Sequence, residues 1–140
     1  METKNYLSPP FAKGGMGGFL ELVKFSHTIF ALPFALASML VAARGYLNQV
    51  WPGTRLFLLI LAAMVTARTS AMAFNRWADA LIDAQNPRTT NRQIPQGIFS
   101  RRFVLTLALA SGLLFIFTTY FINTLAFALA PLALLILWGY

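Results

Sequence analysis

Four long apolar stretches limit what this chain can fold into more than any other feature. They cover about residues 21–43, 56–75, 103–122 and 125–140 of the 140-residue sequence. A helix of about 20 apolar residues, rising about 1.5 Å per residue, crosses the roughly 30 Å hydrocarbon core of a bilayer. Each stretch is near that length. The sequence therefore predicts an all-α integral membrane protein with about four transmembrane helices.

The composition excludes several other classes of protein. Hydrophobic residues make up 58% of the chain and charged residues only 11%, whereas a soluble domain carries about 25% charged residues. A water-soluble enzyme and a disordered chain, which needs few apolar residues, are both excluded. The chain has no cysteine and one histidine, His27. These counts exclude a disulfide scaffold, an iron–sulfur cluster, a cysteine nucleophile and a histidine-rich metal site.

The first residues differ from the rest. Residues 1–18 contain Pro9-Pro10 and the run Gly14-Gly15-Met16-Gly17-Gly18, which are not expected to sustain a helix. We therefore expect residues 1–18 to be a flexible cytoplasmic leader and residues 19–140 to be the membrane domain. Within the first span, Pro33 is expected to cause a kink that a neighbouring helix can tolerate. A leader of this length, followed by three more spans, does not fit a cleaved signal peptide.

The basic residues orient the chain across the membrane. The first loop holds only Arg44 and Arg55. Eight other basic residues lie before the first span, at its start, or between the second and third spans: Lys4, Lys13, Lys24, Arg76, Arg88, Arg92, Arg101 and Arg102. Cytoplasmic loops carry such an excess, so the amino terminus and the loop 76–102 are predicted to be cytoplasmic. No stacking aromatic residues are arranged between these charges, so a nucleic-acid partner is not expected.

A polar stripe runs along the second span. A charge near the centre of a bilayer costs at least about 2.5–3.5 kcal/mol on insertion scales, so such residues usually face a cavity. Spacings of four, three, four and four residues place one set of side chains on a single helical face. The set is Arg68, Met72, Asn75, Asp79 and Asp83. If the helix continues past the membrane surface, an arginine, an amide and two carboxylates share one side.

The two aspartates and the loop after them suggest an anion and metal site. Carboxylates at i and i+4 stand about 5–6 Å apart and repel each other unless a cation lies between them. Mg²⁺ takes one or two carboxylates and completes its shell with water and phosphate oxygens. Arg88 and Arg92 add guanidinium groups that suit phosphate. Each feature alone also fits a solvated helix end or ordinary loop charges, but together they favour a diphosphate site at the membrane surface.

The segment from Asn75 to Gly97 resembles a known motif. An asparagine, aspartates four and eight residues later, and then Arg-Thr-x-Asn-Arg-x-Ile-Pro-x-Gly are similar to the first aspartate-rich motif of the UbiA superfamily of intramembrane aromatic prenyltransferases. Arg68, the segment Lys24-Phe-Ser-His27 and the segment Ala-Leu-Pro33-Phe also match. The pattern most resembles bacterial 4-hydroxybenzoate polyprenyltransferases and their relatives in menaquinone synthesis, over about residues 19–140.

This resemblance implies a ring of helices around a cavity open to lipid, in the bacterial inner membrane. It implies Mg²⁺-dependent transfer of a polyprenyl group from polyprenyl diphosphate to an aromatic acid such as 4-hydroxybenzoate, in ubiquinone or menaquinone biosynthesis. Asn75, Asp79 and Asp83 would bind the metal and, with Arg68, form the catalytic set. The residues implied in diphosphate binding are Lys24, Arg68, Arg88, Asn91 and Arg92.

The chain departs from the family pattern in one respect. Family members are longer, with more spans and a second aspartate-rich motif for a second Mg²⁺. The only acids here besides Asp79 and Asp83 are Glu2 and Glu21, so that motif is missing. We therefore expect the amino-terminal half of a UbiA-type bundle, inactive alone and able to self-associate or to pair with a complementing carboxy-terminal half.

Two other functions remain open from the residues themselves. A small cation transporter or channel subunit would use Arg68, Asp79 and Asp83 in a polar path. That interpretation expects acids inside the spans, whereas both aspartates follow one. A non-catalytic membrane scaffold fragment is the other alternative, and it predicts that Asp79→Ala has no effect.

Overall fold

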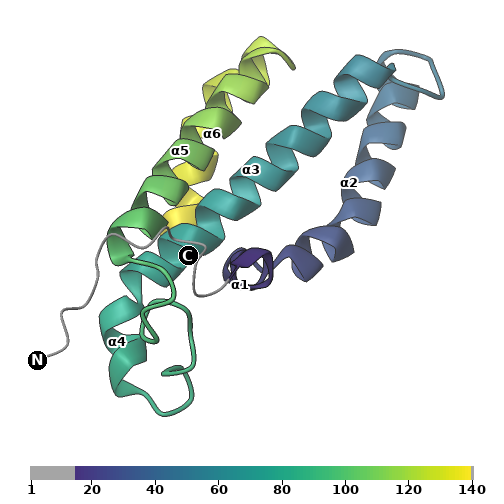
Figure 1. Ribbon diagram of the computed structural model, residues 1–140. Coiled ribbons are helices and arrows are strands. Elements are labelled where there is room, and N and C mark those ends of the chain that lie inside the picture. The colour runs from purple at the N-terminus through teal and green to yellow at the C-terminus, as the bar shows by residue number, and fades with distance from the viewer. Residues whose placement is uncertain (1–14, 140) are drawn as a thin grey trace, which may run out of the picture.

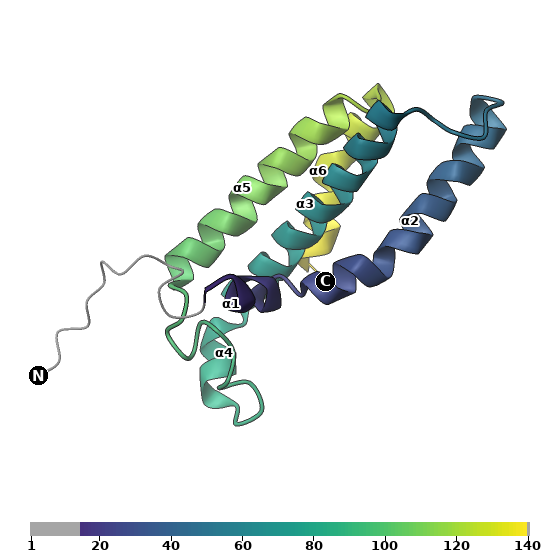
Figure 2. The same cartoon turned by 45° about the vertical axis from the view of Figure 1, so that its right-hand side comes forward.

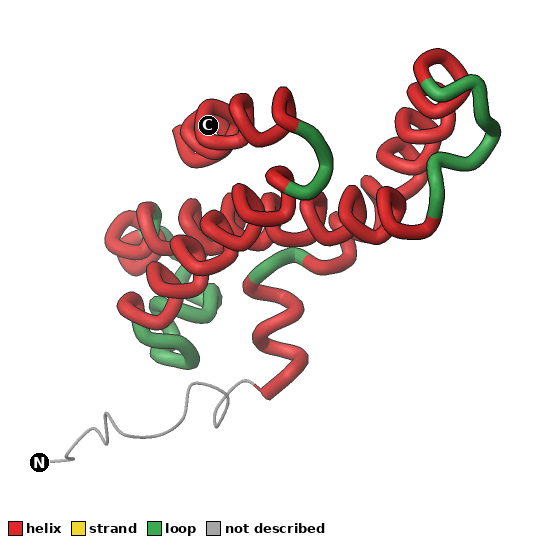
Figure 3. Tube along the Cα trace, turned by 90° about the horizontal axis from the view of Figure 1, so that it is seen from above, coloured by secondary structure: helices red, strands yellow, loops and turns green. Residues whose placement is uncertain are grey.

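The computed structural model describes residues 15–139, and over these residues it contains helices and loops but no strand (Figures 1 and 3). The prediction of an all-α protein is confirmed. The helices are α1 (Gly15–Leu22), α2 (Phe25–Tyr46), α3 (Thr54–Ala78), α4 (Ala80–Gln85), α5 (Arg101–Tyr120) and α6 (Thr124–Gly139).

Three helices are long and apolar enough to cross a membrane, namely α2, α3 and α5. They correspond to the first three predicted spans. The fourth predicted span forms α6, which is apolar but has 16 described residues. At about 1.5 Å per residue α6 is about 24 Å long, which is less than the roughly 30 Å hydrocarbon core. The described chain therefore has three candidate spans and one shorter apolar helix.

The start of the membrane domain differs from the prediction. The first predicted span, 21–43, is divided because Lys24 has a left-handed backbone (φ 50°) between α1 and α2. The expectation that the glycine run excludes a helix is wrong for residues 15–18, which form the first half of α1. A glycine inside a helix costs about 1 kcal/mol relative to alanine, and tertiary packing offsets this cost here. Leu22 is fully buried, and Phe19 packs against the same core. The remainder of the predicted leader, residues 1–14, lies outside the described residues.

The helices α3, α5 and α6 form the best-packed part of the molecule (Figure 2). Ser70 of α3 is buried, and its Oγ donates a hydrogen bond to the carbonyl oxygen of Ala108 in α5 (2.7 Å). Trp138 of α6 donates from Nε1 to the same Ser70 Oγ (3.1 Å) and stacks on Phe74, with ring centroids 4.8 Å apart. Small residues let membrane helices approach closely, and Gly112 faces this contact from α5.

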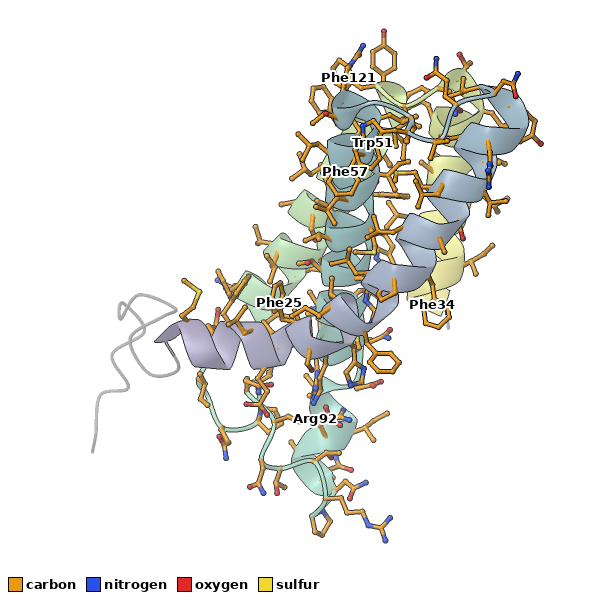
Figure 4. All side chains as sticks on the ribbon, turned by 90° about the vertical axis from the view of Figure 1, so that its right-hand side faces the viewer. Phe25, Phe34, Trp51, Phe57, Arg92 and Phe121 are labelled. Carbon is orange, nitrogen blue, oxygen red and sulfur yellow. The ribbon has the colours of Figure 1, made fainter. Side chains whose placement is uncertain are left out.

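Helix α2 packs more loosely than the others. It contacts α3, but most of its large apolar side chains are exposed. Pro33 lies inside α2, which bends in its first half near the labelled Phe34 (Figure 4). Exposed apolar side chains on a helix of this length suit a lipid environment, where they need no protein partner. The weak pairing of α2 with α3 leaves space between the two helices.

A small apolar core fixes the end of the molecule where α1, α4 and the following loop lie (Figure 2). Its buried members come from α1, α3, the loop and α5: Leu22, Ala73, Phe99, Val104 and Ala108. Phe99 is 1% exposed, so the end of the long loop is held against the helices. This core places α1 and the loop 86–100 at the same end of α3.

Candidate functional site

The two aspartates lie at the junction between α3 and α4. The helix predicted to continue past Asp79 is interrupted there, because α3 ends at Ala78 and α4 begins at Ala80. Helical hydrogen bonds nevertheless cross the junction, from the Asp79 amide to the Asn75 carbonyl (2.9 Å) and from the Asp83 amide to the Asp79 carbonyl (2.8 Å). Asn75, Asp79 and Asp83 therefore keep the i, i+4 relation that the sequence predicts.

The two carboxylates have different surroundings. Asp79 is exposed, whereas the Asp83 side chain is only 7% exposed. The Nη1 atom of Arg92 donates to both carboxylate oxygens of Asp83, at 2.7 Å each. Within the described part of the chain this is the one ion pair closer than 4.0 Å. The structure thus pairs a predicted metal ligand with a predicted diphosphate ligand, and the two charges neutralise each other.

The loop that carries Arg92 is built by local hydrogen bonds. The Asn86 side chain accepts from the Arg88 amide (3.0 Å), a turn that asparagine commonly makes. Thr89 Oγ1 donates to the Asp83 carbonyl (3.1 Å) and ties the loop back to α4. Further on, the Ile98 amide donates to the Gln93 carbonyl (2.9 Å), just before the buried Phe99. The loop is anchored at both ends, which holds Arg92 next to α4 (Figure 4).

Two residues that the sequence analysis did not select lie beside this ion pair. Arg76, in the last turn of α3, is partly buried, and its electrostatic neighbours include Arg92, Asp83 and Glu21. Gln93 is 4% exposed. Among the described residues, neither Arg76 Nη1 nor Gln93 Oε1 has a hydrogen-bond partner, although both atoms are buried. A buried unpaired polar group costs about 1–3 kcal/mol, so the unpaired donor of Arg76 would be satisfied by an anion.

Sequence spacing offers a signal for Arg76 but not for Gln93. Arg76 precedes Asp79 by three residues and Asp83 by seven, which places it on the same side of a helix as the aspartates. Gln93 is buried by the fold of the loop, and no local pattern marks it.

Arg68 lies apart from these groups. It precedes Asp79 by eleven residues, about 16 Å along a helix at about 1.5 Å per residue. It lines a cavity of about 520 Å³ between α2 and α3 together with Ser26, His27, Phe30, Ala31 and Phe34. The Nε atom of Arg68 is buried and has no hydrogen-bond partner among the described residues. The structure therefore does not bring Arg68 together with Asp83 and Arg92, as a single diphosphate site would require.

The other predicted site residues lie in α3, at the break between α1 and α2, and on the loop after α4. Asn75 is partly buried in α3, one turn before Asp79. Lys24 is partly buried at the break between α1 and α2. Arg88 and Asn91 are exposed on the loop. The break between α1 and α2, the last turn of α3 and the loop after α4 all lie toward the same end of α3 (Figure 1).

The donor set fits Mg²⁺ with a phosphate better than it fits a metal alone. The described residues contain no group of three or more histidine or acidic side chains that could hold a metal ion. Mg²⁺ needs only one or two carboxylates when phosphate and water supply the other oxygens. Asp79 is exposed and accessible, whereas Asp83 is buried and both of its oxygens accept from Arg92 Nη1. The unpaired donor of Arg76 adds a contact suited to phosphate.

Comparisons with known proteins identify the family of the chain. The model of the UbiA prenyltransferase family matches residues 31–140, which include α3, α4, the loop and α5. Protoheme IX farnesyltransferase from Parvibaculum lavamentivorans is 37% identical over 95 residues, which cover 66% of this chain and 28% of that protein. No solved structure matches the chain. The chain thus spans less than a third of this relative. Because the family model covers most of its helices and the whole of the ion-pair site, the chain is a multi-pass membrane protein that belongs to the UbiA prenyltransferase family.

Proposed function

We propose that this chain forms the diphosphate-binding part of a Mg²⁺-dependent polyprenyltransferase with an aromatic acceptor such as 4-hydroxybenzoate. The observation that supports this function best is the cluster of Asp83, Arg92 and Arg76 at one end of apolar helices. Carboxylates beside guanidinium groups suit a metal diphosphate, and the apolar surfaces of α2 and α5 suit a hydrocarbon tail.

The chemistry required of these residues is the departure of a leaving group. The bond between the prenyl carbon and the diphosphate oxygen breaks, the diphosphate keeps the electron pair, and an allylic cation remains. An aromatic ring carbon then bonds to that cation and loses a proton. Arg92 and Arg76 would stabilise the negative charge that develops on the leaving oxygen. Mg²⁺, held by Asp79, Asp83 and Asn75, would supply further neutralisation of that charge when bound.

The position of the cluster at one end of the helices supports an active site on the cytoplasmic side of the membrane. The ends of α1, α3 and α4 and the loop 86–100 lie together (Figure 2), and the loop carries Arg88 and Arg92. Under the positive-inside rule this end faces the cytoplasm. The proposal places the protein in the bacterial inner membrane with its amino terminus inside.

The acceptor has two candidate classes. The motif pattern favours an aromatic acid such as 4-hydroxybenzoate, and hence quinone biosynthesis, ubiquinone or menaquinone. The 37% identity to a protoheme IX farnesyltransferase favours a porphyrin acceptor instead. Both classes use the same donor chemistry, so donor binding and acceptor choice are tested separately.

The first test is donor binding by the purified 140-residue chain. Radiolabelled farnesyl diphosphate should bind in the presence of Mg²⁺, and Asp79→Asn should weaken binding at least tenfold, because a metal-bridged carboxylate contributes more than about 1.4 kcal/mol. The matched control is Arg55→Gln, an exposed charge at the other end of α3. Donor binding that is the same without Mg²⁺ and in Asp79→Asn would contradict the proposal and favour a non-catalytic scaffold.

The second test is transfer in membranes that contain the chain. Polyprenyl diphosphate and Mg²⁺ are supplied with either 4-hydroxybenzoate or protoheme IX, and the prenylated product is measured. Because the chain covers 28% of its relative, little transfer is expected unless copies associate or a complementing half is present. Cation flux through vesicles that contain the chain but no prenyl substrate would instead support the transporter alternative.

A further inference from the structure

Helix α5 has two faces whose side chains differ in size. It lies at one side of the molecule, in contact with α3 and α6 (Figure 1). Its buried residues include the small Ala108, Ser111 and Gly112. On the outer face, Leu109 and Leu113 are 44% and 69% exposed. Membrane helices approach one another through small residues, so the outer face of α5 suits lipid better than it suits another helix.

An arginine begins this outer face. Arg102 precedes Leu109 by seven residues and Leu113 by eleven, and these spacings place all three on one side of a helix. Thr106 lies on the same side, but its Oγ1 donates to the Arg102 carbonyl oxygen (3.0 Å), so its hydroxyl proton is already used within the helix. The result is a cation followed by an apolar track. We call this surface the α5 outer stripe, and its residues are Arg102, Thr106, Leu109 and Leu113.

Arg102 has no protein partner of opposite charge. Within the described part of the chain, the one ion pair closer than 4.0 Å joins Arg92 to Asp83. Arg102 is exposed and lies in the first turn of α5, where the positive end of the helix dipole disfavours a cation. Because neither an acidic side chain nor the helix dipole stabilises this charge, it is available to an anion outside the protein.

The length of the stripe matches one leaflet of a bilayer. Helix α5 is a candidate membrane span that begins at Arg101. At about 1.5 Å per residue, Leu109 and Leu113 lie about 10 Å and about 16 Å from Arg102 along the helix axis. One leaflet supplies about 15 Å of the hydrocarbon core. With Arg102 at the membrane surface, the acyl chain of one phospholipid therefore spans the apolar part of the stripe.

We propose that the α5 outer stripe binds a phospholipid with a net negative headgroup, with the phosphate on Arg102 and an acyl chain against Leu109 and Leu113. A zwitterionic phospholipid carries the same phosphate, but its ammonium group offsets the charge, so it should bind less tightly. This lipid site requires neither a prenyl donor nor an acceptor, so it does not depend on the proposed function.

The neighbouring Arg101 offers a matched comparison. It carries the same charge at the same end of α5, but its guanidinium lies over the ring of Trp77 in α3, with Cζ 5.1 Å from the ring centroid. It therefore points toward α3 rather than along the outer stripe. A general attraction of anionic lipid to this end of the molecule would depend equally on Arg101 and Arg102, whereas the proposed site depends on Arg102.

The test measures lipid binding to the purified 140-residue chain in detergent by native mass spectrometry. Dioleoylphosphatidylglycerol is compared with dioleoylphosphatidylcholine, which has identical acyl chains. Phosphatidylglycerol should bind about fivefold more tightly, and Arg102→Gln should remove that preference, as expected for one arginine near a membrane surface. Arg102→Lys keeps the charge and should keep most of the preference. An equal preference in Arg102→Gln and the unchanged protein would overturn the proposal.

Two matched controls separate the stripe from net charge. Arg101→Gln should weaken phosphatidylglycerol binding by less than about twofold. Arg55→Gln should have a similarly small effect: Arg55 is the second residue of α3, as Arg102 is of α5, but Ala62 and Thr66 stand where α5 has its two leucines. Circular dichroism checks that each variant keeps its helical content. Equal weakening in Arg101→Gln and Arg102→Gln would show that binding follows net charge and would overturn the proposal.

Two further experiments test other occupants of the stripe. Because the chain has no cysteine, Leu113→Cys places a single thiol there. In vesicles that contain phosphatidylglycerol, an oxidant should not link copies through this thiol, and efficient formation of a disulfide-linked dimer would place a second copy on the stripe and overturn the proposal. Displacement of phosphatidylglycerol by farnesyl diphosphate that depends on Arg102 would assign the stripe to the prenyl donor and would also overturn it.

Discussion

Arg92 and Asp83 form the one ion pair in the described part of the chain. The spacing of Asn75, Asp79 and Asp83 predicts their common helical side because that relation is local. The return of Arg92 to Asp83, nine residues later, could not be predicted in the same way. It depends on turns at Asn86 and Thr89 and on the burial of Phe99, which is a contact with distant helices.

We predict that Arg92→Gln lowers the free energy of unfolding. It would leave the buried Asp83 carboxylate without its cation, an effect of about 1–3 kcal/mol, below the roughly 3–5 kcal/mol for a fully buried pair because the Arg92 side chain is 35% exposed. Urea unfolding in detergent micelles measures the change. Arg88→Gln, on the same loop but exposed, should change the free energy of unfolding by no more than about 0.5 kcal/mol.

A double-mutant cycle with Asp83→Asn isolates the pair itself. If the two single changes simply add, the contact between Arg92 Nη1 and Asp83 contributes nothing of its own, and the prediction is wrong.

The sequence predicts the long apolar helices, but it does not predict helix bounds that depend on tertiary packing. Hydropathy locates α2, α3 and α5, because about 20 apolar residues suffice to mark a span. It cannot locate the break at Lys24 or the helix through Gly15, Gly17 and Gly18, since both depend on how Leu22 meets its core.

The contact between α3, α5 and α6 gives a prediction for Gly112→Val. A Cβ at Gly112 would lie 3.0 Å from Ser70 Oγ and 3.3 Å from Trp138, so a larger side chain must push these helices apart. We expect a loss of about 1–3 kcal/mol in unfolding free energy and an altered Trp138 fluorescence. Gly45→Val in α2 has the same change in helix propensity with no atom within 4 Å of the new Cβ. Equal losses in the two variants would show that the close approach of α5 to α3 and α6 at Gly112 contributes nothing to stability.

For the whole molecule, the sequence predicts the number of apolar segments better than their arrangement. Helices that are apolar all round carry little periodic signal, so the loose contact of α2 with α3 could not be foreseen. The separation of Arg68 from the pair of Asp83 and Arg92 follows from that arrangement. The stripe of Arg68, Asn75, Asp79 and Asp83 suggested one site, but the structure places Arg68 in a cavity with α2.

The orientation of the molecule can be tested directly because the chain has no cysteine. Gln49→Cys lies in the loop between α2 and α3, and Thr90→Cys lies in the loop after α4, on opposite ends of α3. In intact cells, a membrane-impermeant maleimide should label Gln49→Cys and reach Thr90→Cys only after the membrane is opened. Labelling of Thr90→Cys from outside would reverse the proposed orientation.

The ion pair at the end of α3 also determines how two ligands would influence each other. Arg92 Nη1 donates to both oxygens of Asp83, so this contact competes with a cation for Asp83 and with a phosphate for Arg92. Under the proposed function, each ligand frees the partner that the other needs. Thermodynamic reciprocity then requires that the divalent cation raise the affinity for diphosphate by the same factor as diphosphate raises the affinity for the cation. The pair would thus make the site heterotropically cooperative, with a weak response to either ion alone.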